Sequence, residues 1–305
     1  MLPSLDTLPP WITYWIDLLR SAGKNWFETK AFIHAAALAF FTVFSIAPVL
    51  IVVVTVTGMV LGESAAEGRL MEYVSALIGT EAGQLVEDAV MNSQLDRGGL
   101  GPTLIGLVAI IVGATTVFAQ MQQSLNAIWD VVPKPNRSGV LLYLKQRLLS
   151  LTVVLSIGFL LLVSLVLSVA VQAVLSYADQ WVSLSPGAVV GADLIGSVLV
   201  ISLLFAAIFK VLPDVRLRWL DVLPAGLLTA VLFILGRYLM ARYLTNTAIA
   251  SAYGAAGSLV LLLLWVHYSA LILLFGAAFS RAQLEARGLI IRPTHGAALV
   301  TRQLL

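Results

Sequence analysis

Ionisable side chains inside long apolar segments are the residues of this chain with the clearest chemical potential. Arg237 and Arg242 stand in an apolar segment over residues 222–244, and Asp193 stands in another over residues 188–212. A charge at bilayer depth costs about 2.5–3.5 kcal/mol on insertion scales, so each is a candidate binding or transport position that needs a partner. If the two segments cross a membrane in opposite directions, Asp193 and Arg237 lie at similar depth. We predict that they form a pair or share a polar cavity; the alternative is that Arg237 extends to the interface on its long side chain while Asp193 reaches water.

A third apolar segment, residues 257–280, contains His267 about ten residues from its start and is preceded by Tyr253 in a polar, glycine-rich turn. An imidazole titrates near physiological pH and can relay protons. A neutral histidine bonded to a carbonyl or a hydroxyl is the alternative, and we favour it. His267 and Tyr253 are therefore binding or transport candidates rather than catalytic ones.

Amide side chains crowd the second half of another apolar segment, residues 103–127. In lipid their donors and acceptors would be unsatisfied, so such groups face other helices or water. They either line an inward-facing crevice or lie at the inner interface, and both interpretations stay open. The run consists of Gln120, Gln122, Gln123, Ser124 and Asn126.

The sequence contains no recognisable set of catalytic residues. The three histidines, His34, His267 and His295, are far apart along the chain, so no zinc cluster is available. There is no cysteine, no phosphate-binding loop, no GxSxG and no glycine-rich dinucleotide turn. We predict that the protein is not an enzyme, holds no metal or cofactor and binds no nucleic acid.

The elements that must position these residues are membrane helices. The chain has 60% hydrophobic and 11% charged residues, against roughly 25% charged in a soluble domain. Since about 20 apolar residues cross a bilayer, we predict an all-α integral membrane protein with six transmembrane helices. They are expected at about 35–61, 103–127, 148–175, 188–212, 222–244 and 257–280, with Pro224 in the first turn of the fifth.

Amphipathic segments flank these spans. Residues 1–34 are predicted as a cytoplasmic region with an interfacial helix over 10–30, and the outer loop 62–102 as surface helices. The transmembrane domain covers 35–281 and a tail follows over 282–305, its last dozen residues weakly ordered. Close helix contacts are expected at small residues, namely Gly106, Gly113, Gly191, Gly196, Gly254 and Gly257.

The distribution of positive charge predicts the orientation. With the N-terminus inside, the inner segments hold fourteen lysines and arginines, whereas the outer segments hold two. Lysine and arginine accumulate in short cytoplasmic loops. Both termini are therefore predicted to be cytoplasmic.

Several motifs resemble those of the BrkB/YihY-like family of bacterial inner-membrane proteins. They are Tyr253–Ser258 with Leu263–Ala270 and Gly276–Phe279, Ala36–Thr42 with Ser45–Pro48, Ser124–Trp129, and Leu212–Pro213 with Trp219 and Asp221. The resemblance covers about residues 30–285 and implies a multi-pass protein of the plasma (inner) membrane. The family once carried a ribonuclease label, now regarded as mistaken, and members have been linked to serum resistance and lipid export. The family usually has glutamate where this chain has Ala278 and tyrosine where this chain has Phe41. A mechanism that needs a carboxylate or a phenol at these positions therefore does not carry over.

Two classes of function fit these observations. The first is a transporter or flippase-like protein that handles a lipid or another amphipathic solute, with membrane lipids as partners and a possible homo-oligomer. The second is a structural or assembly factor whose buried polar residues only specify helix packing. A solute channel is a further alternative.

The predicted topology is testable because the chain has no cysteine. Single cysteines at Ser93, Ser183 and Ser251 should react with an impermeant thiol reagent in intact cells, whereas a cysteine at Ser138 should react only after lysis. Labelling at Ser138 in intact cells would reverse the orientation.

Overall fold

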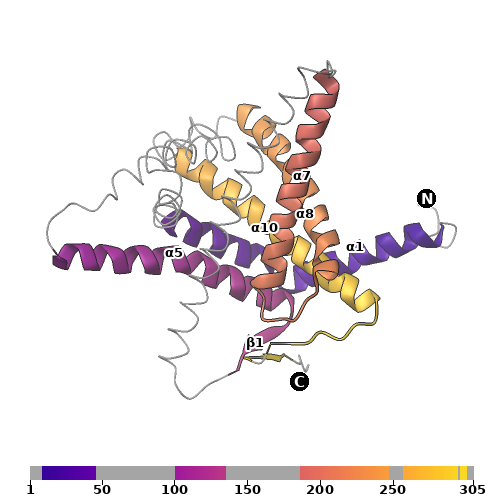
Figure 1. Cartoon of the computed structure of the whole chain (residues 1–305), viewed down its shortest axis with the longest axis horizontal. Coiled ribbons are helices and arrows are strands. Elements are labelled where there is room, and N and C mark those ends of the chain that lie inside the picture. The colour runs from indigo at the N-terminus through magenta and orange to yellow at the C-terminus, as the bar shows by residue number, and fades with distance from the viewer. Residues whose placement is uncertain (1–8, 46–99, 135–185, 247–256, 295, 301–305) are drawn as a thin grey trace, which may run out of the picture.

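The computed structural model describes residues 9–45, 100–134, 186–246, 257–294 and 296–300. Within them, long helices dominate and two three-residue strands accompany them (Figure 1). The elements are α1 (Pro10–Glu28), α5 (Leu100–Ile128), β1 (Val131–Pro133), α7 (Pro186–Val211), α8 (Trp219–Asn246), α10 (Gly257–Ala286) and β2 (Ala297–Leu299). A further helical segment, Ala31–Ser45, follows α1.

Two of the described helices are long and apolar enough to cross a membrane. They are Trp219–Met240 of α8 and Leu259–Ala286 of α10, with mean hydropathies of 1.9 and 2.3. Ile12–Glu28 and Ala31–Ser45 qualify together as a bent pair, whereas Ile195–Val211 of α7 is a shorter apolar helix. The helical fold is therefore confirmed, and the described residues contain two candidate membrane spans, or three if the bent pair is one span. The count of six spans and the orientation stay predictions, because the segments at 62–99 and 148–175, most of the first span and Tyr253 lie outside the described residues.

The bend after α1 has a local cause. The C-cap of α1 is Thr29, and Lys30 then adopts φ 56°. A left-handed residue directly after a C-cap ends many helices and is most often glycine, since a side chain there costs about 1–2 kcal/mol. The chain re-enters a helix at Ala31, and the two helices meet at 65°. His34 thus lies in the first turn of the second helix, and the start of the first span at about residue 35 stays a prediction.

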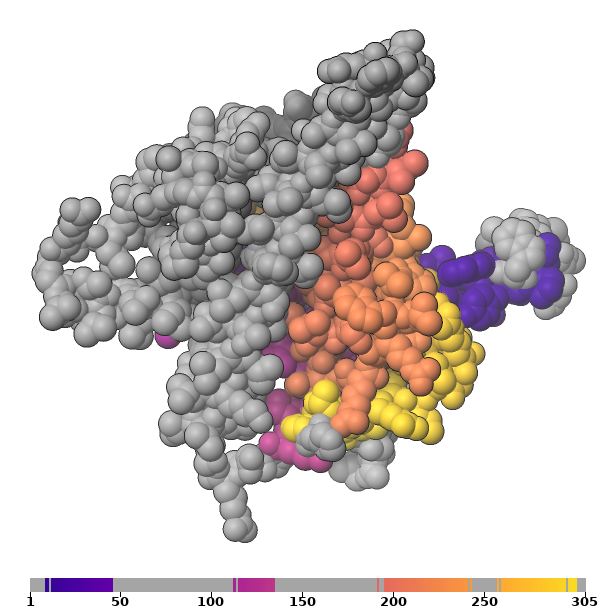
Figure 2. Space-filling model, in the orientation of Figure 1, coloured from indigo at the N-terminus to yellow at the C-terminus, as the bar shows by residue number. Residues whose placement is uncertain are grey.

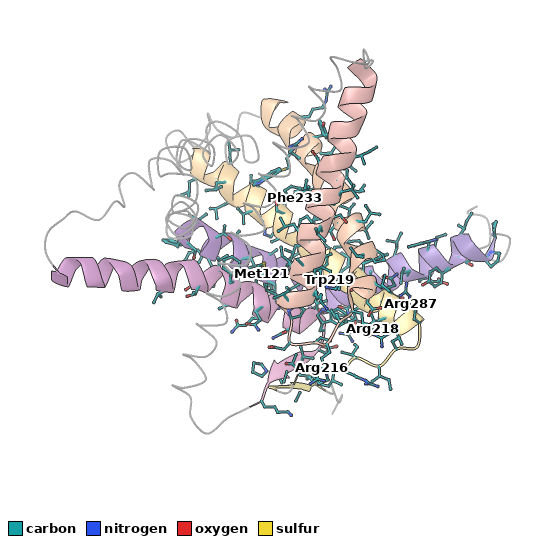
Figure 3. All side chains as sticks on the ribbon, viewed as in Figure 1. Met121, Arg216, Arg218, Trp219, Phe233 and Arg287 are labelled. Carbon is teal, nitrogen blue, oxygen red and sulfur yellow. The ribbon has the colours of Figure 1, made fainter. Side chains whose placement is uncertain are left out.

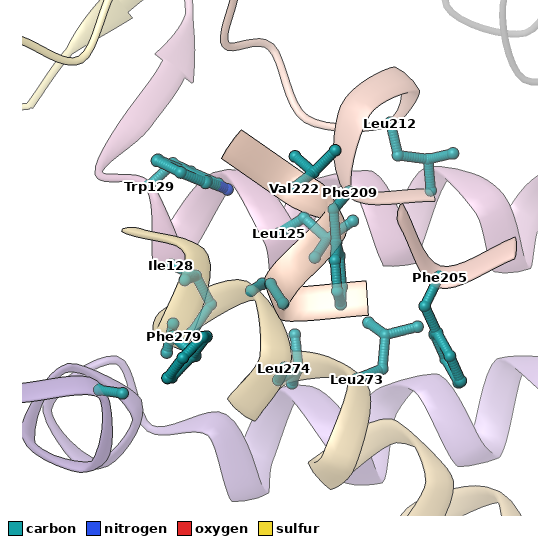
Figure 4. Close-up of a cluster of buried hydrophobic side chains, with 14 of the residues drawn as sticks. Leu125, Ile128, Trp129, Phe205, Phe209, Leu212, Val222, Leu273, Leu274 and Phe279 are labelled. Atoms are coloured by element: carbon teal, nitrogen blue, oxygen red, sulfur yellow. The ribbon is translucent and has the colours of Figure 1, made fainter. Parts of the chain in front are cut away.

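The described core lies where α7, α8 and α10 meet the last turn of α5 (Figure 4). Leu125, Trp129, Phe209 and Leu274 are fully buried there. The N-terminal part of α1 extends away from this body (Figure 2), while further along it packs on α10, with Trp15 stacked 6.3 Å from Phe279. The core thus joins segments from both ends of the chain.

The outer faces of α7 and α8 are apolar and exposed. Along α8 the exposed residues recur every fourth position, at Leu223, Leu227, Val231, Leu235 and Leu239. Residues four apart lie on one face of a helix. Such a continuous apolar stripe is expected of a helix that contacts lipid.

The C-terminal segment is held by backbone pairing, which corrects the prediction of a weakly ordered tail for its described part. β2 pairs antiparallel with β1, and the N–H of Val300 donates to the carbonyl of Asp130 at 2.8 Å. The N–H of Thr294 donates to the carbonyl of Asp214 at 2.9 Å. The small sheet is a β element that the all-α prediction did not include. Strands of three residues are too short to be recognised in a sequence.

Helix α8 begins earlier than predicted, and Pro224 therefore lies inside it rather than in its first turn. Asp221 explains the early start, because its carboxylate accepts the N–H of Arg218 at 3.2 Å, as the third residue of a capping box does. Pro224 has no N–H for the carbonyl of Leu220, whose side chain is exposed.

Glycines allow close helix approach at several positions. Gly191 and Gly196 have no atom of the described residues within 4 Å of where a Cβ would be, so close contacts at these two positions stay a prediction. The tight positions are Gly226, against α7, and Gly236 and Gly276. A Cβ at Gly226 would lie 2.5 Å from the carbonyl oxygen of Ser202, which is backbone and cannot rotate away.

Replacing Gly226 by alanine should therefore destabilise the α7–α8 contact. We expect Gly226→Ala to lower the free energy of unfolding by about 1–3 kcal/mol, as other overpacked contacts do. Gly196→Ala is the matched control on α7 and should be neutral or stabilising by about 0.5–1 kcal/mol. Thermal unfolding of the purified protein in detergent measures both, and equal behaviour of the two variants would contradict the packing described.

Candidate functional site

A largely buried arginine at the end of α10 connects several elements. Arg281 Nη1 donates to the carbonyl of Ile128 at 2.6 Å and to Asp130 Oδ2 at 2.7 Å, and its Nε donates to Glu285 Oε1 at 2.7 Å. The carbonyls in the last turn of a helix have no partner within the helix, and Ile128 is the last residue of α5. Arg281 therefore caps α5 with a side chain from another helix.

Asp130 turns the chain from α5 into β1. It has φ 49°, a conformation that aspartate tolerates better than most residues. Its carboxylate pairs with Arg281, and the two side chains are 23% and 16% exposed. The charge at the turn is thus offset where water is largely excluded.

Helix α1 joins the same group of residues. In the amide orientation that satisfies its neighbours, the Asn25 oxygen accepts from Arg281 Nε at 3.1 Å and from Nη1 at 3.2 Å. Trp26 Nε1 donates to the carbonyl of Leu271 on α10 at 3.2 Å. The ends of α1, α5 and α10 are therefore connected by hydrogen bonds as well as by packing.

Two of the predicted amide candidates bind a carboxylate from the α7–α8 link. Asn126 Nδ2 donates to Asp214 Oδ2 at 2.8 Å, and Asn126 Oδ1 accepts the N–H of Asp214 at 2.8 Å. Gln122 Nε2 donates to Asp214 Oδ1 at 3.3 Å. Gln120 reaches Ser124 Oγ within its own helix at 3.5 Å, whereas Gln123 is exposed. Asn126 and Gln122 thus help to hold two elements together, and Gln123 points to no described partner.

Cationic side chains gather at this end of the molecule, where Arg216, Arg218 and Arg287 are labelled in Figure 3. Lys210, which is half-buried, donates to the carbonyl of Leu217 at 2.8 Å and lies 5.4 Å from the centre of the Trp219 ring. Arg287 lies 3.7 Å from the Asp221 carboxylate, and Arg218 is exposed nearby. A cationic surface beside an exposed tryptophan is typical of a membrane interface.

The other predicted candidates lie elsewhere. Arg237 is exposed on α8, with its guanidinium 5.6 Å from the centre of the Tyr238 ring. The side chain of Asp193 lies outside the described residues, so its pairing with Arg237 stays a prediction. Arg242 is exposed near the end of α8, and His267 is half-buried on α10.

Where the family pattern places glutamate, Ala278 is fully buried and belongs to the core cluster, whereas Phe41 is half-buried beside Phe40. Among the described residues, no group of three histidine, aspartate or glutamate side chains could hold a metal ion.

Four interacting residues were not predicted from the sequence: Asp130, Asp214, Asp221 and Arg281. Each stands directly beside an apolar segment, which is a signal in the sequence, but a position beside a segment does not identify the partner. Their partners come from positions as far as 151 residues along the chain. Contacts between residues so far apart cannot be inferred from the spacing of residues within one segment.

Long apolar helices that are fastened at one end by buried polar contacts define a helical membrane protein. The chain matches the family described as "Virulence factor BrkB" over residues 23–294, and it belongs to that family.

Named relatives agree with this class. The chain is 30% identical over 279 residues to "UPF0761 membrane protein RSc1559" of Ralstonia nicotianae, covering 86% of this chain and 56% of that protein. It is 28% identical over 274 residues to "UPF0761 membrane protein AZOSEA40600" of Aromatoleum aromaticum, covering 87% and 63%. It therefore spans less than two thirds of these two proteins.

A relative from Bacillus subtilis, "Putative ribonuclease-like protein YfkH", is 27% identical over 254 residues, which cover 79% of this chain and 86% of that protein. That name alone carries no catalytic residues to this chain. No solved structure is significantly similar.

Removing the guanidinium of Arg281 should destabilise the protein, because the Ile128 carbonyl and the Asp130 carboxylate lose their partner. We expect Arg281→Gln to lower the free energy of unfolding by about 1.5–3 kcal/mol, the range for hydrogen bonds to charged groups. The matched control is Arg287→Gln on the same helix, whose side chain is 42% exposed. Its loss should cost about 0–1 kcal/mol. If thermal unfolding in detergent ranks the two variants the other way, Arg281 does not hold these helix ends together.

Proposed function

We propose that this protein is a multi-pass protein of the bacterial inner membrane that handles an anionic amphipathic lipid, moving it between leaflets or towards the outer surface. The lipid's headgroup would follow polar and cationic side chains at the surface of the helices. Its tails would stay in the bilayer, so no wide aqueous pore would be needed.

The single observation that carries the proposal is the position of Arg237. It is exposed on a helix whose neighbouring exposed residues are Leu235, Tyr238 and Leu239. Within the described side chains no carboxylate pairs with it, and its described contact is the Tyr238 ring. A cation on an apolar, lipid-facing surface is costly unless it has a partner, and a lipid phosphate is a partner that the bilayer itself supplies.

The predicted cytoplasmic end offers further donors. Gln123 is exposed on α5, and Arg216 and Arg218 are exposed on the link before α8. Guanidinium groups bind phosphate through fixed, paired donors. An anionic headgroup would therefore meet donors near both ends of its route.

One observation favours a second candidate, a structural or assembly factor. Asn126 and Gln122 donate hydrogen bonds to Asp214. In a purely structural protein, amide side chains of membrane helices would serve to hold elements together in this way. This role predicts that the polar residues matter for stability and not for any movement of lipid.

Lipid exchange in liposomes separates the two candidates. Purified protein should accelerate the transfer of headgroup-labelled phosphatidylglycerol between leaflets. Arg237→Gln and Gln123→Leu should each slow this transfer about tenfold, the effect of losing one charge-assisted or desolvated hydrogen bond. Arg292→Gln is the matched control, because Arg292 is exposed on the C-terminal segment and lies outside the apolar helices.

Thermal unfolding must show that the variants are folded. If the folded wild type transfers no anionic lipid faster than empty liposomes, with and without an ion gradient, autonomous lipid transport is wrong and the assembly-factor function replaces it.

A further inference from the structure

A pocket of about 350 Å³ lies at the bend between α1 and the helix that begins at Ala31. Its walls come from this bend, from the last turn of α5, from β1 and from Val300, which follows β2; Val132 and Val300 are among the apolar residues that line it. Volumes of about 300–1,000 Å³ are usual for sites that bind small molecules. None of the predicted binding candidates lines it, so it is separate from the surface around Arg237.

The acidic residues of the pocket already have partners. Asp130 is bound by Arg281 at 2.7 Å, and Glu28 lies 3.8 Å from Lys24 on α1. Each negative charge thus has a cation beside it that does not line the pocket, and Arg281 is shared between Asp130 and Glu285.

The two basic residues of the pocket, unlike its acidic residues, lack side-chain partners among the described residues. Lys30 and His34 line it one helical turn apart, with the N–H of His34 donating to the carbonyl of Lys30 at 3.4 Å. Neither side chain has a hydrogen bond or an ion pair with any side chain in the described part of the chain. The pocket therefore offers two side-chain donors, one of them the charged Lys30, that are not engaged by the described side chains.

The backbone at the pocket is unusual at two of its lining residues. Lys30 has φ 56° and Asp130 has φ 49°, and both line the pocket. Left-handed residues other than glycine persist where the surrounding structure holds them, and they cluster at ligand sites. Glycine would satisfy the turn at position 30 at lower cost, so the turn itself does not explain a lysine there.

We propose that this pocket binds a phosphate-bearing anion. The Lys30 ammonium and the His34 imidazole would donate to the phosphate oxygens, while Val132 and Val300 would contact an apolar portion of the ligand. Two donors in one pocket beside apolar residues suit a phosphate monoester on a lipid or on a small soluble molecule. The site does not depend on lipid transport, because a regulatory or structural ligand would need the same donors.

Binding to the full-length protein in detergent tests the proposal. The probes are dihexanoyl phosphatidic acid, dihexanoylglycerol, which lacks the phosphate, and glycerol 3-phosphate, which lacks the acyl chains. We expect phosphatidic acid to bind the wild type, and we expect Lys30→Gly and His34→Gln each to raise its Kd about tenfold, as the loss of one charge-assisted hydrogen bond would. Lys30→Arg should keep the Kd within about twofold, since it keeps a cation that donates to phosphate.

Two controls separate binding from folding. Lys30→Gly removes the ammonium but suits the positive φ, so its melting temperature should not fall below that of the wild type. Arg20→Gln removes an exposed cation of α1 that does not line the pocket, and it should leave the Kd unchanged.

The outcomes are distinct. Competition by glycerol 3-phosphate at a similar Kd supports a soluble phosphate ligand, and its failure to compete supports a lipid headgroup. Equal binding of dihexanoylglycerol, no binding of either phosphate probe, or equal Kd values for Lys30→Gly, His34→Gln and Arg20→Gln would overturn the proposal.

Discussion

The contacts of the Arg281 guanidinium are the interaction on which the described end of the molecule depends. One side chain satisfies the last carbonyl of α5 and two carboxylates, and it meets Asn25 of α1. Lysine could not replace it, because a compact ammonium has no planar fork to reach acceptors on separate elements. The cost of burying this charge is offset only when all these elements are in place, so the contact selects one arrangement of helix ends.

Helices with apolar outer faces need such contacts. In a bilayer, lipid competes with neighbouring helices for apolar surface, so association relies on close packing and on polar groups. The chain uses both: Gly226 brings α8 against the backbone of α7, and Asp214 binds Asn126 and Gln122 of α5. The apolar stripe along α8 contributes little to this choice, which explains why it remains exposed.

The helices were predictable because a long apolar run in a sequence has few explanations other than a membrane helix. The prediction of α8 and α10 as helices of membrane length followed from their apolar runs. Their ends and partners were not predictable. The capping of α8 by Asp221 moved its start to Trp219, and a left-handed Lys30 produced the bend after α1. The pairing of Asp214 with Asn126 spans 88 residues, so it depends on packing that no local pattern encodes. Amide residues indicated a polar environment, yet only the fold determined which of them met a carboxylate.

The same arginine determines the charge of the pocket at the bend. Asp130 lines that pocket, and an unpaired carboxylate there would repel any anion that Lys30 and His34 attract. Because Arg281 holds Asp130 from the side of α10, the acid is neutralised without an occupant in the pocket. The Lys30 ammonium then faces the pocket beside a carboxylate that already has a cation, and this arrangement exists only while α5 and α10 keep their contact. A ligand that is attracted by Lys30 and His34 would therefore bind the assembled arrangement more tightly than one with the helix ends apart, and by linkage it would stabilise that arrangement.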